Sequence, residues 1–88
     1  MNYEVYYQKK AEKWILANKK SAERFLSAFE EISKDIKGIF QIYYIVKLKG
    51  NSDFFRLRIG KYRAIFTIQN DELIILVINI DSRGGIYK

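Results

Sequence analysis

Six cationic side chains gather in one short stretch of the sequence. Residues 47–63 carry these six and one acidic side chain, Asp53, so the stretch has a net charge of +5, against +6 for the whole chain. A field of this sign favours a polyanion such as nucleic acid, or an acidic protein partner. Arginine suits the first because its guanidinium presents a fixed fork of donors to phosphate oxygens. The candidate phosphate-binding residues are Lys47, Lys49, Arg56, Arg58, Lys61 and Arg63.

The composition limits the chemistry that these residues could support. The chain contains no histidine and no cysteine. Histidine is the usual acid/base group at neutral pH and the commonest metal ligand, so zinc catalysis and Ser-His catalysis are excluded. Disulfides and thiolate metal sites are excluded as well. Any chemistry must therefore use Lys, Arg, Tyr, Asp, Glu or electrostatics alone, and we expect no metal and no cofactor.

A tight β-hairpin is expected to position the arginines. Two strand-like runs, residues 54–59 and 62–69, are joined by a Gly-Lys dipeptide, and a two-residue connection with glycine is a strong hairpin signal. The strand period of two puts the apolar residues of the first run on one face and Arg56 and Arg58 on the other. These arginines are either a phosphate-binding surface or ordinary solvated charges on the outside of a sheet.

Length and composition indicate one folded domain, residues 1–88. Hydrophobic residues make up 49% of the chain and aromatic residues 16%, which excludes a disordered protein. The longest apolar run, residues 73–78, is far too short to span a membrane. Polar residues interrupt the N-terminal segment where a signal peptide would be apolar. We therefore expect a cytoplasmic protein without a membrane partner.

A strand and two helices are expected before the hairpin. Residues 3–8 alternate in polarity and favour a strand, and residues 9–18 change to a helical period. A break is expected at Asn18 and the two lysines after it. Ser21 is then the predicted N-cap of a second helix that ends at Gly38. The expected core residues of the helices are Trp14, Phe25 and Phe29.

The remaining segments complete an α+β fold. Residues 39–46 have a β-rich composition without clean alternation and are expected to form a buried linker or a short strand, and residues 47–53 a loop. After the hairpin, Asn70-Asp71 make a second tight turn. The continuous apolar run in residues 72–81 predicts a central strand covered on both faces. The sequence thus predicts an N-terminal strand, a two-helix hairpin and a three-stranded antiparallel meander in one sheet, with the helices on one face.

Two motifs stand out in this order of elements. One is the run RLRIG at residues 56–60 followed by Tyr62-Arg63, and the other is the closing Arg83 with Tyr87 four residues later. Over essentially its full length the chain resembles the RelE/ParE superfamily of type II toxin–antitoxin toxins, and these motifs favour the RelE branch. Similar proteins of that branch are ribosome-dependent endoribonucleases, or mRNA interferases, which cleave messenger in the ribosomal A site.

The resemblance implies roles for individual residues. Arg63 matches an arginine that contacts the scissile phosphate, Arg83 matches the arginine after the last strand, and Tyr87 matches a C-terminal tyrosine. That tyrosine stacks on a messenger base and helps to orient the attacking group. These three residues are the expected catalytic set, and Arg56 and Arg58 are expected to hold the flanking backbone.

Such a reaction is compatible with a chain that lacks histidine. The messenger supplies its own 2′-hydroxyl as the nucleophile, so the protein contributes alignment and positive charge. Each fixed donor is typically worth about 3–4 kcal/mol. The partners that the resemblance implies are the ribosome, its mRNA and a cognate RelB-like antitoxin, which would be acidic and helical and could form a heterotetramer with the toxin.

Two other functions stay open at this point. The first is a ParE-like toxin that inhibits a topoisomerase without cutting RNA. The second is a non-catalytic RNA-binding domain, although the paired aromatic motifs of sheet-type RNA readers are missing. At the level of single residues, Tyr87 could instead anchor the chain end on the sheet. Arg83 could form a surface ion pair with Asp81 or Asp71, which would contribute little energy.

Overall fold

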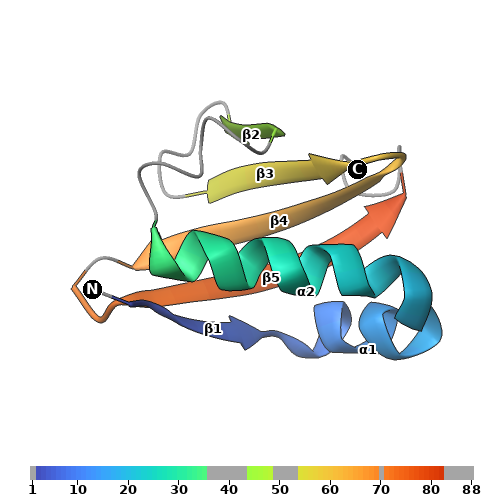
Figure 1. The fold of residues 1–88 in the computed structure, drawn as a ribbon, viewed down its shortest axis with the longest axis horizontal. Helices are drawn as coiled ribbons and strands as arrows, with labels where there is room; N and C mark the ends of the chain where they lie inside the picture. Colours follow the sequence, from blue (N-terminus) through green and yellow to red (C-terminus); the bar gives the residue numbers. More distant parts are fainter. Residues whose placement is uncertain (1, 36–43, 49–53, 70, 83–88) are drawn as a thin grey trace.

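The computed structural model describes residues 2–35, 44–48, 54–69 and 71–82. Within these ranges, two helices pack on one face of a five-stranded sheet, which confirms the α+β class and the arrangement predicted for the helices (Figure 1). Neither helix in the described part of the chain has the length and the apolar character needed to cross a bilayer. The elements in chain order are β1 (Glu4–Tyr7), α1 (Lys9–Ala17), α2 (Lys19–Lys34), β2 (Tyr44–Lys47), β3 (Phe54–Ile59), β4 (Tyr62–Gln69) and β5 (Ile74–Ser82).

The strand order in the sheet is β1-β5-β4-β3-β2. The meander β3-β4-β5 is antiparallel as predicted, and β1 joins it parallel to β5. A fourth antiparallel strand, β2, pairs with β3 and begins within the ambiguous segment 39–46. Assigning Lys47 to a loop was wrong, because the β2–β3 pairing includes this residue and continues with a 2.9 Å bond from the Leu48 N–H to the Phe54 carbonyl. Residues 39–43 and 49–53 lie outside the described residues.

A single residue, Asn18, separates the two helices. Its backbone N–H donates to the carbonyls of Trp14 and Ile15, at 2.9 and 3.3 Å, and its side-chain Nδ2 also donates to the Trp14 carbonyl, at 2.9 Å. These bonds satisfy carbonyls that the end of α1 would otherwise leave unpaired. The Asn18 carbonyl then accepts from the Ala22 N–H at 2.8 Å and begins α2. The prediction of Ser21 as N-cap was therefore wrong, because the N-cap of α2 is Asn18, three residues earlier.

The C-terminal end of α2 is joined to β1. The Ser33 hydroxyl donates to the Glu30 carbonyl at 2.6 Å, and the Ser33 carbonyl accepts from the Tyr3 N–H at 2.8 Å. Asp35 leaves the helical region, with φ −147° and ψ 82°, so α2 ends at Lys34. The predicted end at Gly38 was too late, and Gly38 itself lies outside the described residues.

Aromatic contacts fix the helices on the hairpin. The ring of Trp14 lies edge-on to Phe25 at 5.8 Å and to Tyr62 of β4 at 5.1 Å, and the ring of Phe29 lies edge-on to Phe66 at 5.2 Å. Phe25, Phe29 and Phe66 are fully buried, and Trp14 packs against the same core. The prediction of Trp14, Phe25 and Phe29 as core residues is confirmed. The inner face of the hairpin is therefore held by both helices.

The opposite face of the sheet, here called the outer face, is not covered by either helix (Figure 1). On β5, Ile75 and Val77 are buried on the helix side, whereas Leu76 and Ile78 are only partly buried. The central position of β5 is confirmed, but its predicted coverage on both faces was wrong. A β-bulge contributes to this geometry, because the β4–β5 register shifts between Ile65 and Phe66 and leaves Ile78 as an extra residue.

Candidate functional site

Three arginines lie together on the outer face. Arg58 of β3 lies directly opposite Arg63 of β4, and Arg56 lies opposite Ile65. Directly opposed residues have Cβ atoms about 4.5–5.5 Å apart, and residues two apart on one strand are about 7 Å apart. Like charges directly opposite each other destabilise a sheet. An anion bound between these guanidinium groups would offset that repulsion.

The arginines differ in how they are held. Arg58 is exposed, as expected of a solvated charge, but Arg56 and Arg63 are half-buried and their Nε atoms are buried. Asp81 of β5 lies opposite Arg63, and its Oδ1 accepts a 2.7 Å hydrogen bond from the Ser82 N–H. Three guanidinium groups and this one carboxylate leave a net charge of +2 on the four side chains. Packing against the sheet therefore limits the motion of two arginines, which favours a binding surface over simple solvation.

The hairpin turn that sets this register is the one predicted. Ile59 lies opposite Tyr62, so Gly60 and Lys61 form a two-residue connection. Gly60 has φ 60°, a left-handed conformation that glycine adopts without steric cost. The Lys61 Nζ lies 5.4 Å from the centroid of the Tyr62 ring. Lys61 is thus at the tip of the hairpin, beside the aromatic contact between Tyr62 and Trp14.

The other predicted site residues are not part of this cluster in the described structure. Lys47 is exposed on β2 and lies opposite Phe55, whose side chain packs into the core, so Lys47 belongs to the helix side of the sheet. Lys49, Arg83 and Tyr87 lie outside the described residues. Of the candidate set, the structure therefore brings together Arg56, Arg58 and Arg63, and the arginine cluster below means these three residues.

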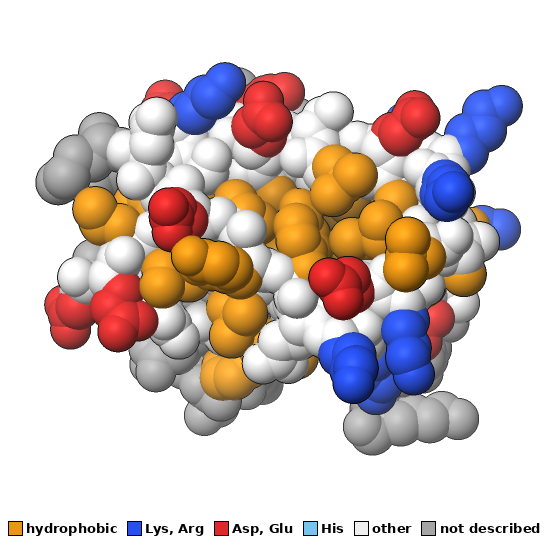
Figure 2. Space-filling view, turned by 90° about the horizontal axis from the view of Figure 1, so that it is seen from below, with side chains coloured by type: hydrophobic (Ala, Val, Ile, Leu, Met, Phe, Trp, Pro, Cys, Tyr) orange, Lys and Arg blue, Asp and Glu red, His pale blue; other side chains and the backbone are white. Residues whose placement is uncertain are grey.

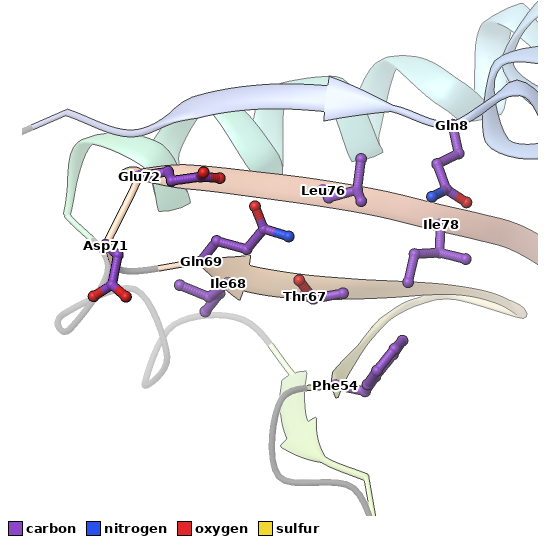
Figure 3. A pocket seen from close by; sticks show the side chains of 9 residues that line it. All are labelled: Gln8, Phe54, Thr67, Ile68, Gln69, Asp71, Glu72, Leu76 and Ile78. Atoms are coloured by element: carbon purple, nitrogen blue, oxygen red, sulfur yellow. The ribbon is translucent and has the colours of Figure 1, made fainter.

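A shallow depression of about 710 Å³ continues the outer face beyond the arginine cluster. Its lining comes from neighbouring strands, with Asp71 and Glu72 at its far end, in the turn between β4 and β5 (Figure 3). Sequence reasoning missed this feature because it treated β5 as covered on both faces. The residues that form its floor and sides include Gln8, Phe54, Thr67, Gln69, Leu76 and Ile78.

Two tyrosines of β1 lie on opposite faces of the sheet. The Tyr6 hydroxyl donates to Glu4 Oε1 at 2.7 Å, and this bond, together with the carboxylate charge, raises the pKa of Tyr6. Burial, with a smaller effect of Glu30, raises the pKa of Tyr7 to about 12. Neither phenol is therefore suited to act as a base at neutral pH.

Seen from the side of β1, hydrophobic side chains spread across the middle of the molecule and most Lys and Arg side chains gather toward one end (Figure 2).

The chain matches a known family over nearly all of its length. Residues 2–87 match the family model described as the ParE toxin of type II toxin–antitoxin system, parDE. The chain belongs to this toxin family. The predicted resemblance to the RelE/ParE superfamily is confirmed, and with it the interpretation of the sequence as that of a toxin.

Individual relatives point to the RelE branch. Over 44 residues the toxin is 41% identical to a protein named as toxin RelE1 of Methanocaldococcus jannaschii, and the match spans about half of each chain, 50% of this one and 49% of the other. A chain of the archaeal RelE–RelB complex from Pyrococcus horikoshii OT3 superposes with a TM-score of 0.79 at 25% identity, covering 97% of the toxin and 99% of that chain. The isolated E. coli RelE toxin has the same fold, with a TM-score of 0.73 at 17% identity over 97% of the toxin and 90% of that chain. The toxin is therefore RelE-like.

Proposed function

We propose that this toxin is a metal-independent mRNA interferase, an endoribonuclease that cleaves messenger in the ribosomal A site. The observation that carries the proposal is the arginine cluster on the outer face. Two of its members are held by packing, and the three together concentrate positive charge on one part of the outer face. A phosphodiester backbone is the anion that matches several arginines spaced along two strands.

The proposed reaction uses the 2′-hydroxyl of the messenger. Its oxygen loses its proton to water and attacks the adjacent phosphorus, the bond to the 5′-oxygen breaks, and the leaving oxygen takes up a proton from water, which leaves a 2′,3′-cyclic phosphate. Arg63 and Arg83 would offset the charge that develops on the phosphoryl oxygens, and each such donor is worth about 10²–10³ in rate. Arg56 and Arg58 would hold the flanking phosphates, while Tyr87 would stack on a base or orient the nucleophile.

Dependence on the ribosome follows if the toxin supplies positive charge and the ribosome aligns the substrate. An arginine cannot take up the proton of the 2′-hydroxyl, because it stays charged at any useful pH. A site built on arginine therefore gains most when the substrate already has the in-line geometry, and alignment alone can lower a barrier by about 7–11 kcal/mol. Lys49 and Lys61 would then contact more distant phosphates of the messenger or of the ribosome, whereas Lys47 lies on the helix side of the sheet, away from the proposed RNA path.

An antitoxin is the second proposed partner. The relative from Pyrococcus horikoshii was crystallised as a RelE–RelB complex. A RelB-like protein with an acidic, helical segment could lie over the arginine cluster and block access to RNA, in a heterotetramer of two toxins and two antitoxins. Co-expression of the neighbouring gene followed by co-purification tests this partner directly.

Mapping of RNA 5′ ends after induced expression tests the nuclease proposal. The wild-type toxin should create new 5′ ends within translated codons, and Arg63→Ala and Arg83→Ala should each abolish them. Lys47→Ala is the matched control, since it also removes one cation but from the helix side of the sheet, and it should keep most of the activity. Intact messenger in cells that express the wild-type toxin would contradict the proposal.

A ParE-like activity is the second candidate, because the family model that matches is named for ParE. A toxin of that kind would inhibit a topoisomerase and leave RNA uncut. Covalent complexes of gyrase with DNA, recovered from the same induced cells, would support this candidate. A non-catalytic RNA-binding domain would instead show RNA binding with no new 5′ ends and no trapped gyrase.

A further inference from the structure

The outer face changes character in successive rows across the strands. One row places Arg58, Arg63 and Asp81 side by side on β3, β4 and β5. Two residues further along β3 lies Arg56, opposite Ile65. Side chains in neighbouring rows are about 7 Å apart. The cationic part of the face therefore extends over two rows and ends at Arg56.

The next row is apolar and forms the depression. Phe54 of β3 lies opposite Thr67 of β4, Thr67 lies opposite Leu76 of β5, and Leu76 lies beside Tyr6 of β1. The bulge adds Ile78, and the sticks of Phe54, Thr67 and Ile78 converge on one side of the depression (Figure 3). Among the residues that line the depression, this part of the face offers one aromatic ring, that of Phe54, and an apolar floor from Leu76 and Ile78, directly beyond Arg56.

Polar groups flank this apolar floor at both ends. The Gln69 amide lies on the side away from the arginines and the Gln8 amide lies at the opposite end, beside Ile78 (Figure 3), and each amide can both donate and accept hydrogen bonds. Asp71 and Glu72 lie beyond Gln69, both exposed. A ligand of this depression is thus expected to carry its negative charge at the end near Arg56 and to be flat and apolar in the middle. Its far edge should form hydrogen bonds and should carry no negative charge, because Asp71 and Glu72 lie there.

We infer that the depression binds one unpaired nucleobase of the RNA, stacked against Phe54, while Arg56 holds the phosphate of the same nucleotide. The inference rests on the proposed function, because it takes RNA as the ligand of the arginine cluster. The spacing of about 7 Å between the rows of Arg56 and Phe54 allows one nucleotide to place its phosphate at Arg56 and its base at Phe54. Asp71 and Glu72 repel phosphate, so they orient the backbone toward the arginines and the edge of the base toward the Gln69 amide.

An oligonucleotide with a missing base tests this contact. The probe is a 2′-O-methyl pentanucleotide, which cannot be cleaved because its 2′-oxygens are blocked, and a matched series carries one abasic position in turn. Binding to the purified toxin at 50 mM salt is measured by fluorescence anisotropy. Loss of a base–aromatic stack by Phe54→Ala should weaken binding of the intact probe roughly 5- to 150-fold. Phe54→Tyr keeps the ring and should bind nearly as the wild type.

The decisive comparison combines the two changes. At one position of the series, the abasic probe should bind wild type and Phe54→Ala equally, whereas the other abasic probes should keep the difference. A mere loss of folding would weaken every probe alike, and the exposed Leu16→Ala on α1 serves as the neutral control. Arg56→Ala should reduce the dependence on salt, and Phe54→Ala should leave it unchanged.

Three results would overturn the inference. They are an equal effect of Phe54→Ala on all abasic probes, no binding of the intact probe by the wild type at 50 mM salt, and protection of Phe54 by the antitoxin with no protection by RNA. These results are separate from a failure of the proposed function. A toxin that cuts messenger but shows no coupling between Phe54 and a base keeps the function and loses the inference. A toxin that shows the coupling but leaves messenger intact keeps the base site and loses the nuclease.

Discussion

The salt dependence of RNA binding offers the sharpest test of the arginine cluster. For single strands, the slope of log K against log salt concentration is about −0.7 per phosphate contact. Three contacts from Arg56, Arg58 and Arg63 give a slope of about −2.1, so affinity should fall about 18-fold between 50 and 200 mM salt. Removing one contact by Arg63→Ala leaves a slope of about −1.4 and a fall of about 7-fold.

The control for this experiment is Lys47→Ala. Both substitutions remove one positive charge, but Lys47 is exposed on the helix side of the sheet, while Arg63 is half-buried on the outer face. Fluorescence anisotropy of the uncleavable pentanucleotide at four salt concentrations gives the slope for each variant. We expect Lys47→Ala to keep the wild-type slope. If both variants lowered the slope equally, RNA would be responding to the total charge of the toxin, and the argument from the outer face would fail.

Three further predictions concern the fold that holds the cluster. Gly60→Ala should lower the free energy of unfolding in urea by about 1–2 kcal/mol, because φ is 60° there, although no heavy atom lies within 4 Å of the added Cβ. In the folded protein the pKa of Tyr7 is raised to about 12 from its ordinary value of 10.0. The contribution of the neutral Tyr7 side chain to the free energy of unfolding is therefore complete below pH 10 and is lost as the pH rises toward 12. Over that range the wild type should lose about 1–2 kcal/mol relative to Tyr7→Phe, a value reduced for solvent screening because the ring is only half-buried. Trp14→Ala removes contacts with two aromatic rings and should cost about 3–5 kcal/mol in the same urea assay, whereas Leu16→Ala, which is 67% exposed, should stay within about 0.5 kcal/mol of the wild type.

Local signals explain why the hairpin could be predicted from sequence. The alternation in β3 and the two-residue connection at Gly60 together determine that Arg58 lies opposite Arg63. Both features depend on neighbouring residues alone. The same-face placement of the arginines therefore follows from the local sequence, whereas their partial burial depends on packing between strands and does not.

Features that depend on distant pairing were not accessible in this way. The face on which Lys47 lies follows from the register of β2 against β3, which no local motif specifies. The start of α2 was misjudged because Ser21 has the preferred side chain of an N-cap, whereas Asn18 begins the helix through its backbone carbonyl. The apolar run of β5 indicated a central strand, but it has no alternation that distinguishes the face under the helices from the outer face.

The parallel pairing of β1 with β5 has a consequence for how the toxin is made. Glu4 lies beside Ile74 and Tyr7 beside Val77, so β1 pairs with a strand that lies 70 residues later in the sequence. Contacts between residues this far apart in sequence form late and slow folding. At about 5–20 residues per second, the nascent chain would wait roughly 4–14 s after making β1 before the residues of β5 were synthesised. The sheet that carries the arginine cluster therefore cannot close until the residues of β5 have been synthesised, and an active toxin cannot exist before then.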